Sequence, residues 1–171
     1  SGGEALLQID FVTELFTLAK EKGVNTCLDT AGNPFTREEP FYSKFEKLME
    51  VTDLFMLDIK EMDEDEHKQL TGQTNKNILD MATCLSDHGK AMWIRHVLVP
   101  GITDDDGQLH RLRAFIDTLK TVERVEILPY HTLGVFKWKE LGIPYALEEV
   151  EPPTKEQVEY AREIIIPGYK S

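Results

Sequence analysis

The sequence predicts an α/β fold in which about four parallel strands are covered by outer helices. Three observations favour this class. Short, nearly continuous apolar runs alternate with longer amphipathic segments, the amphipathic segments end at glycines, and polar residues follow the apolar runs. Apolar strands that alternate with helices form parallel sheets through right-handed crossovers. These patterns fit either a parallel sheet covered on both faces or a barrel covered on its outside, and four strands are too few for a closed barrel.

The first half of the chain goes through this alternation twice. Residues 5–22 repeat apolar side chains at helical spacing and stop at Gly23, which predicts the first helix. Residues 24–30 are short and partly β-branched, and a loop with glycine and proline follows, which predicts a strand. The second cycle has a helical pattern over 41–50, an apolar strand over 54–59, and helical patterns over 64–70 and 78–88.

The second half completes the set. An apolar run over 91–99 predicts the third strand. Asp104–Asp106 then supply a cap and an acidic first turn for a helix that continues to residue 119. Residues 125–128 predict a fourth strand. After a proline-rich connector, a capping-box sequence opens a last helix over 154–165.

The composition is that of one ordinary globular domain, which we expect to span residues 1–171. Hydrophobic residues make up 41% of the chain and charged residues 29%. With 19 Lys and Arg against 31 Asp and Glu, the net charge is −12, so we expect neither nucleic acid nor an acidic membrane as a partner. No apolar run is long enough to cross a bilayer, and the opening residues lack a signal-peptide pattern, so we expect a cytoplasmic protein.

The two cysteines, Cys27 and Cys84, do not suggest a metal site. Neither belongs to a C-x-x-C motif or to a Cys/His cluster. Cys27 lies in an apolar strand, and nothing near it in sequence would lower its pKa. We therefore expect both to be reduced, buried thiols.

Polar or charged residues lie at the end of every predicted strand. The carboxyl ends of parallel strands meet at one rim, which is where α/β proteins bind their ligands. The rim residues, in chain order, are Glu4, Asp29, Thr30, Asp58, Lys60, Arg95 and His131. Glu4 is included because it stands where a strand before residue 1 would end.

Each rim residue also has a purely structural explanation. Asp29 and Thr30 can cap a helix, Lys60 can be a solvated charge, and Arg95 can be an ion-pair partner of Asp58 or Asp29. Their convergence at one rim favours a binding site instead, because buried charges are costly without partners. Carboxylates suit an ammonium group or a hard cation and basic groups suit a carboxylate, so a zwitterionic ligand such as an amino acid fits this rim.

Five ordered blocks of sequence carry a resemblance to a known family. They are SGGEA at 1–5, TCLDTAG at 26–32, VTDLFMLDIK at 51–60, WIRHVLVPG at 93–101 and LPYHTLG at 128–134. Together they resemble the activating enzymes of glycyl-radical enzymes, within the radical S-adenosylmethionine family. The resemblance implies that this chain is the C-terminal part of a radical-SAM-type partial (β/α)6 barrel.

The resemblance also implies an activity. Members of this family cleave S-adenosylmethionine reductively at a 4Fe-4S cluster, and the 5′-deoxyadenosyl radical removes a glycine hydrogen from a partner enzyme. The implied partner is a glycyl-radical enzyme of the pyruvate formate-lyase type. The implied electron donor is flavodoxin-like or ferredoxin-like.

The resemblance assigns roles to the rim. Gly3 and Glu4 would hold the methionyl amino group, Arg95 and Lys60 would reach the carboxylate, and His131 would lie by the adenosine. Asp58 would belong to this S-adenosylmethionine site and also to a site for a monovalent cation such as K⁺ or Na⁺. The cation ligands would be Asp29, Thr30, Asp58 and Met56, the last through its backbone carbonyl. Lys60 and the loop after it would face the partner's glycine-bearing loop.

One departure from the family stands out. The family's C-x3-C-x2-C motif, which supplies three iron ligands, is absent from this sequence, and Cys27 and Cys84 cannot replace it. We expect the motif to lie upstream of residue 1, so this chain alone should make no radicals. The first two strands of a six-stranded barrel are also lacking, which would leave the edge of the first predicted strand uncovered.

Two other functions stay open at this point. A catalytically silent module could keep the rim and bind S-adenosylmethionine or a partner protein. A metal-dependent β/α hydrolase or lyase could use Asp29, Asp58 and His131 as metal ligands. Tightly bound zinc in the isolated chain would favour this last alternative.

Overall fold

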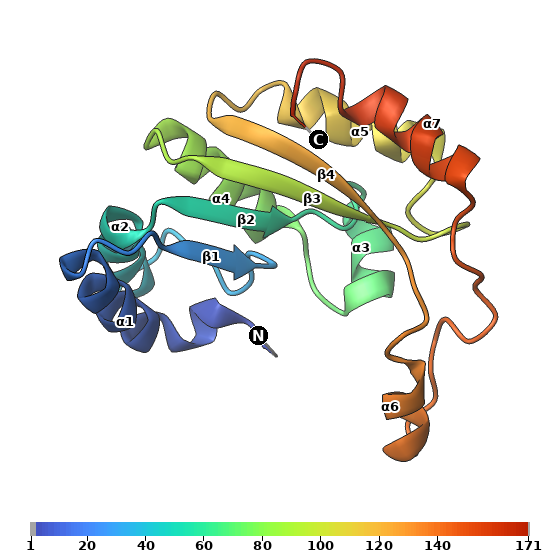
Figure 1. Cartoon of the computed structure of the whole chain (residues 1–171), viewed down its shortest axis with the longest axis horizontal. Coiled ribbons are helices and arrows are strands. Elements are labelled where there is room, and N and C mark those ends of the chain that lie inside the picture. The colour runs from blue at the N-terminus through green and yellow to red at the C-terminus, as the bar shows by residue number, and fades with distance from the viewer. Residues whose placement is uncertain (1–2, 171) are drawn as a thin grey trace.

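Four parallel strands form one sheet in the sequential order β1-β2-β3-β4 (Figure 1). The computed structural model describes residues 3–170. Its strands are β1 (Cys27–Thr30), β2 (Leu54–Asp58), β3 (Met92–Leu98) and β4 (Val122–Pro129). Its helices are the 3₁₀ turn η1 (Ala5–Gln8), α1 (Ile9–Glu21), α2 (Phe41–Val51), α3 (Glu64–Thr71), α4 (Lys76–Asp87), α5 (Asp106–Ile116), α6 (Val135–Glu140) and α7 (Lys155–Ile165). The predicted α/β class with four parallel strands is confirmed.

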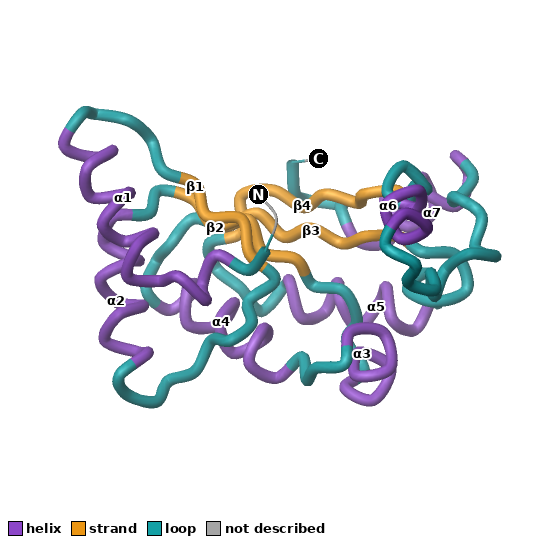
Figure 2. Tube along the Cα trace, turned by 90° about the horizontal axis from the view of Figure 1, so that it is seen from below, coloured by secondary structure: helices purple, strands orange, loops and turns teal. Residues whose placement is uncertain are grey.

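The two faces of the sheet differ. Helices α2, α3, α4 and α5 lie on one side of the strands (Figure 2). Side chains that point to this side, such as Phe55, Leu57 and Ile94, are fully buried, whereas their neighbours along β2 and β3 are half-buried. This period of two arises because successive side chains of a strand point to opposite faces. The face away from these helices is therefore free to carry polar groups.

An aromatic cluster fills the core between α2 and the sheet. Phe45 of α2 lies 4.9 Å from Phe35 and 6.1 Å from Phe55 of β2, measured between ring centroids. Phe45 and Phe55 are completely buried. Gly32, just past β1, has φ +78°, and a Cβ there would lie 3.1 Å from Ile78 and Leu57 side-chain atoms. Only glycine fits this turn, which brings the chain back over the core.

Several boundaries differ from those predicted. The first helix is divided, because the Glu4 side chain accepts from the amide of Leu6 and caps a 3₁₀ turn before α1 begins. Strand β1 starts only at Cys27, since the amide of Thr26 donates to the Asp53 carboxylate. Strand β4 is longer than predicted because it pairs with β3 along its whole length. Helix α6 was not predicted. No helix among residues 3–170 has the length and apolarity that spanning a membrane requires.

His96 joins the end of β2 to the loop after β3. It faces the helices, not the rim, and its ring nitrogens lie 2.9 Å from the Ile59 carbonyl and 3.0 Å from the Thr103 carbonyl. Burial lowers the pKa of His96, and Lys60 acts in the same direction, against the two carbonyls and Asp58. A neutral ring can donate a hydrogen bond to only one of the two carbonyls, whereas a protonated ring could donate to both. The pKa of His96 is nevertheless lowered, because the cost of burying the positive charge is larger than the gain from the second hydrogen bond.

We expect the substitution Phe45→Ala to lower the free energy of unfolding by about 3–5 kcal/mol, because it leaves a cavity among rings that cannot close it. Urea denaturation of the wild-type chain and the variant measures this loss. Phe11→Ala is the matched control, since Phe11 is 62% exposed on α1, and it should change stability by no more than about 0.5 kcal/mol. A loss below about 1 kcal/mol at Phe45 would contradict the described packing.

We expect stability to fall as the pH drops below about 6.5, the ordinary pKa of histidine. The unfolded chain then binds a proton at His96 that the folded chain excludes, so protonation favours unfolding. Urea denaturation at several pH values between 7.5 and 5.5 should show a smaller slope for His96→Gln than for wild type. His110→Gln, at an exposed position, should keep the wild-type slope. Equal slopes for wild type and His96→Gln would show that His96 is not buried as described.

Candidate functional site

Three of the predicted rim residues meet on the open face of the sheet. Asp58 and Arg95 are paired in register across β2 and β3, and Asp29 is paired with Met56, two residues before Asp58 on the same face. Because the strands are parallel and in sequential order, these side chains project from neighbouring strands toward one another. The local sequence thus supplies the charges, and the register of the sheet brings them together.

Arg95 bridges the two carboxylates. Its Nε donates to Asp58 Oδ1 at 2.8 Å and its Nη1 to Asp29 Oδ2 at 3.1 Å, while Nη2 contacts both carboxylates. The Arg95 side chain is only 15% exposed, against 56% for Asp29. Burial acts to lower the pKa of Arg95, but the carboxylates of Asp58 and Asp29 outweigh it and raise that pKa. Arg95 is therefore an ion-pair partner of both Asp58 and Asp29, and not of only one of them.

Lys60 extends this cluster beyond the end of β2. Its Nζ lies 3.6 Å from Asp58 Oδ2, so the Asp58 carboxylate faces a guanidinium on one oxygen and an ammonium on the other. The Lys60 side chain is half-buried. We call the group of Asp29, Asp58, Lys60 and Arg95 the rim cluster. The two negative and two positive formal charges cancel. This pairing offsets part of the desolvation free energy that these partly buried charges lose.

Glu4 ties the start of the chain to the end of β1. Its carboxylate accepts from the amides of Leu6 at 3.0 Å and Ala31 at 2.9 Å, and from the Thr30 hydroxyl. The Thr30 hydroxyl in turn accepts from the Gly32 amide at 2.9 Å. Gly3 beside them is exposed, with φ +152°. The first two residues of the predicted SGGEA block lie outside the described residues.

The other two predicted residues lie near the rim without joining the cluster. Met56 is half-buried on the same face of β2, in register with Asp29. His131 is exposed and follows β4 after one intervening residue. Across residues 3–170, no group of three or more His, Cys, Asp or Glu side chains is placed to hold a metal ion. The ligand set of the hydrolase or lyase alternative, which needs His131 beside Asp29 and Asp58, is thus not assembled in this structure.

The two cysteines lie on opposite sides of the sheet. The expectation that both are buried is wrong for Cys27, which is exposed, because residues 27 and 29 of β1 share the open face. Burial and the nearby Asp29 raise the pKa of Cys27, against a smaller effect of Arg95. Cys84 is buried on α4, where desolvation raises its pKa. Two separated thiols with raised pKa values do not fit a 4Fe-4S cluster, which needs several converging thiolates.

Further polar residues continue the open face onto β4, and sequence reasoning missed them. The Arg124 guanidinium lies 4.8 Å from the centroid of the Trp93 ring, and its Nε lies 3.1 Å from Glu126. Glu126 is in register with Arg95. Charged and apolar residues alternate over 124–127, which was the available signal, but the predicted strand begins only at residue 125.

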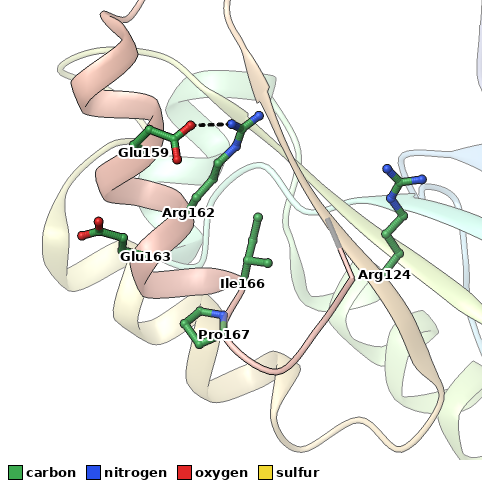
Figure 3. A pocket seen from close by; sticks show the side chains of 6 residues that line it. All are labelled: Arg124, Glu159, Arg162, Glu163, Ile166 and Pro167. Carbon is green, nitrogen blue, oxygen red and sulfur yellow. Dashed lines mark hydrogen bonds and ion pairs between the residues drawn. The ribbon is translucent and has the colours of Figure 1, made fainter.

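A hollow of about 580 Å³ lies elsewhere, between α7 and β4 (Figure 3). It is lined by Arg124, Glu159, Arg162, Glu163, Ile166 and Pro167. Arg162 pairs with Glu159 at 2.6 Å within α7. None of the predicted rim residues lines this hollow.

Comparison with known proteins assigns the family. The family model described as the radical SAM superfamily matches residues 1–112. A pyruvate formate-lyase-activating enzyme of Streptococcus mutans is 58% identical over 165 residues, which are 96% of this chain and 63% of that protein. One of Listeria monocytogenes is 51% identical over 165 residues, 96% of this chain and 66% of that protein. The chain thus spans a little under two thirds of the length of these relatives.

Solved structures share the fold. A domain of a pyruvate-formate lyase-activating enzyme from Bacteroides vulgatus aligns with a TM-score of 0.79 at 21% identity, covering 99% of this chain and 93% of that one. Coproporphyrinogen III oxidase of Escherichia coli, a radical SAM enzyme, aligns with a TM-score of 0.59 at 12% identity, covering 91% and 35%. The matched family model and this shared fold agree with the resemblance found in the sequence, and the chain belongs to the radical SAM superfamily.

Proposed function

We propose that the protein activates a glycyl-radical enzyme of the pyruvate formate-lyase type, by reductive cleavage of S-adenosylmethionine and removal of a hydrogen atom from a glycine of that enzyme. The observation that carries the proposal is the rim cluster, in which two carboxylates and two cations converge at the carboxyl ends of the strands. Relatives at 51–58% identity, named as activating enzymes of pyruvate formate-lyase, support this choice of partner.

The rim fits the amino acid end of S-adenosylmethionine. Arg95 and Lys60 supply positive charge for the ligand carboxylate, and Glu4 supplies a carboxylate for its ammonium group. Of the five N–H groups of Arg95, at least one on Nη1 is not committed by its contacts with Asp29 and Asp58. The ligand can therefore add to the cluster without first breaking it. Exposed Gly3 leaves the backbone accessible beside Glu4.

A monovalent cation such as K⁺ or Na⁺ would strengthen this site. Asp29 and Asp58 supply carboxylate oxygens and Met56 a backbone carbonyl on two adjacent strands. Thr30, the fourth proposed ligand, lies next to Asp29, but its hydroxyl is already hydrogen-bonded to Glu4 and Gly32. A cation between the two carboxylates would replace part of the charge that Arg95 supplies to them, and would leave more of its guanidinium for the ligand carboxylate. His131, exposed just after β4, would contact the adenosine end. This division of roles follows the chemistry of each donor.

The proposed activity also requires a 4Fe-4S cluster, and the rim residues do not bind one. Cys27 and Cys84 face opposite sides of the sheet, so the cluster would need ligands from outside the 171 residues. We therefore propose that this chain alone makes no radical, and that it acts as part of a longer protein that receives electrons from a flavodoxin-like or ferredoxin-like donor. When bound, the cluster would supply the electron for cleavage of S-adenosylmethionine.

A second candidate is a catalytically silent module that binds S-adenosylmethionine or the partner protein. One observation favours it, namely that the sequence contains only two cysteines and no C-x3-C-x2-C motif. Both candidates use the same rim cluster of charged side chains. They differ in whether the functional protein also contains cysteines that bind a 4Fe-4S cluster. Formation of a glycyl radical by the reconstituted longer protein separates them.

In a protein that joins this chain to a C-x3-C-x2-C segment, we expect Arg95→Ala and Asp58→Ala each to weaken S-adenosylmethionine binding roughly 10- to 100-fold. Each removes a charged hydrogen-bonding group from the rim cluster, and such groups contribute about 1.5–3 kcal/mol. Isothermal titration calorimetry measures the change. Arg37→Ala is the matched control, because its ion pair with Asp80 of α4 lies away from the rim. Unchanged affinity in either rim variant, with the fold intact, would remove that residue from the proposed site.

After anaerobic reconstitution with iron and sulfide, we expect the 171-residue chain to retain no 4Fe-4S cluster, and the longer protein to retain one. Iron analysis and electron paramagnetic resonance of the reduced samples measure this. With reductant, S-adenosylmethionine and purified pyruvate formate-lyase, only the longer protein should generate a glycyl radical signal. A stoichiometric cluster in the chain alone would contradict the proposed need for outside ligands. A longer protein that holds its cluster but gives no radical would leave the binding module as the function.

A further inference from the structure

The loop that follows β2 is fixed in place although it has no regular secondary structure. It spans residues 59–63, between the end of β2 and the start of α3, and we call it the Lys60 loop. At its first residue, the Ile59 amide donates to the Arg95 carbonyl at 3.0 Å, and the Ile59 carbonyl lies 2.9 Å from Nδ1 of the buried His96. The backbone that leads into Lys60 is therefore held by β3.

A buried side chain from another helix holds the other end of the loop. Asn75, immediately before α4, is 3% exposed, and its Nδ2 donates to the carbonyls of Glu61 at 3.1 Å and Met62 at 2.8 Å. An asparagine at the start of a helix usually accepts a hydrogen bond from an amide of the first turn. Within the described residues, the Asn75 side chain makes no such bond to α4. It joins α4 to the Lys60 loop instead of capping its own helix.

Glu61 adds a second set of hydrogen bonds, inside the loop itself. It is also 3% exposed, and its Oε1 accepts from the amides of Met62 at 2.6 Å and Asp63 at 3.0 Å. Burial raises the pKa of Glu61, although the two amides act to lower it. Burying a carboxylate is costly. At this position the carboxylate stabilises one conformation of the loop, since the two amides belong to the next two residues.

Lys60 is the residue that this loop contributes to the rim cluster. Its half-buried side chain places Nζ 3.6 Å from Asp58 Oδ2. A lysine side chain has many rotamers, and fixing them when a ligand binds costs free energy. A backbone that is already fixed on both sides of Lys60 restricts where its ammonium group can lie before the ligand arrives. The contacts of Asn75 and Glu61 therefore affect the rim, although neither side chain belongs to the rim cluster.

We propose that Asn75 and Glu61 are positioning residues, which hold the Lys60 loop so that the Lys60 ammonium group stays beside Asp58 and can bind the carboxylate of S-adenosylmethionine. This inference rests on the proposed function, which gives Lys60 that ligand. It assigns a role to two buried residues that contribute no group to the ligand.

A double-mutant cycle in the longer protein, which joins this chain to a C-x3-C-x2-C segment, tests the inference. The serine in Asn75→Ser is too short to reach both carbonyls, but serine remains a good residue at the start of a helix. We expect this substitution to weaken S-adenosylmethionine binding roughly threefold to tenfold in isothermal titration calorimetry. In a Lys60→Met background, the same substitution should change affinity less than about twofold, because no ammonium group remains to be positioned.

Further variants separate positioning from a general loss of structure. Glu61→Gln keeps an acceptor for the two amides and should bind S-adenosylmethionine like wild type, whereas Glu61→Ala should weaken binding as Asn75→Ser does. Asn77→Ser is the matched control on the same helix, because the Asn77 side chain donates to Asn33 in the loop after β1 and should leave affinity unchanged. Hydrogen–deuterium exchange in the Lys60 loop should be at least about threefold faster in Asn75→Ser and unchanged in Asn77→Ser.

Equal losses of affinity for Asn75→Ser in the wild-type and Lys60→Met backgrounds would overturn the inference, because they would indicate a general structural role. Unchanged affinity or unchanged loop exchange in Asn75→Ser, beside normal wild-type binding, would also overturn it and leave the proposed function standing. A wild-type longer protein that binds no S-adenosylmethionine would reject the proposed function and this inference with it. If Asn75→Ser does not fold, Glu61→Ala in the same two backgrounds gives the same comparison.

Discussion

The alternation of side chains along four parallel strands, combined with the packing of helices α2 to α5 on one side of the sheet, is the constraint on which the rest of this structure depends. Every second residue of β2 and β3 is buried against the helices, and apolar side chains such as Phe55, Leu57 and Ile94 occupy those positions. The intervening positions lie on a partly solvated face, where charged groups are tolerated if they are paired. Along each of these strands, one residue thus belongs to the buried apolar core and the next residue belongs to the polar face.

Charge neutralisation explains how the rim cluster is held at the edge of the core. Arg95 is largely buried, and its two aspartate partners outweigh the desolvation that opposes its charge. A zwitterionic ligand would leave the net charge of this cluster unchanged, which is the physical basis of the proposed S-adenosylmethionine site. Glu4 couples η1 to this rim through Thr30 and Ala31, so the start of the described chain and the end of β1 form one hydrogen-bonded unit.

The middle and the carboxyl end of β4 differ in what they contribute. Its middle continues the polar face through Arg124 and Glu126, and its carboxyl end leads through His131 into helix α6.

The sequence by itself determined the order and type of most elements and the residues that end each strand, because hydrophobic periodicity and turn residues are local properties of the chain. It also carried the five blocks that indicated the superfamily. Only the tertiary structure decided that Arg95 pairs with both aspartates, that His96 faces the core, and that Cys27 is exposed. It alone revealed helix α6, too. The physical reason is that the face of a strand that becomes buried depends on helices packed from distant parts of the chain, and local periodicity does not specify which helices those are.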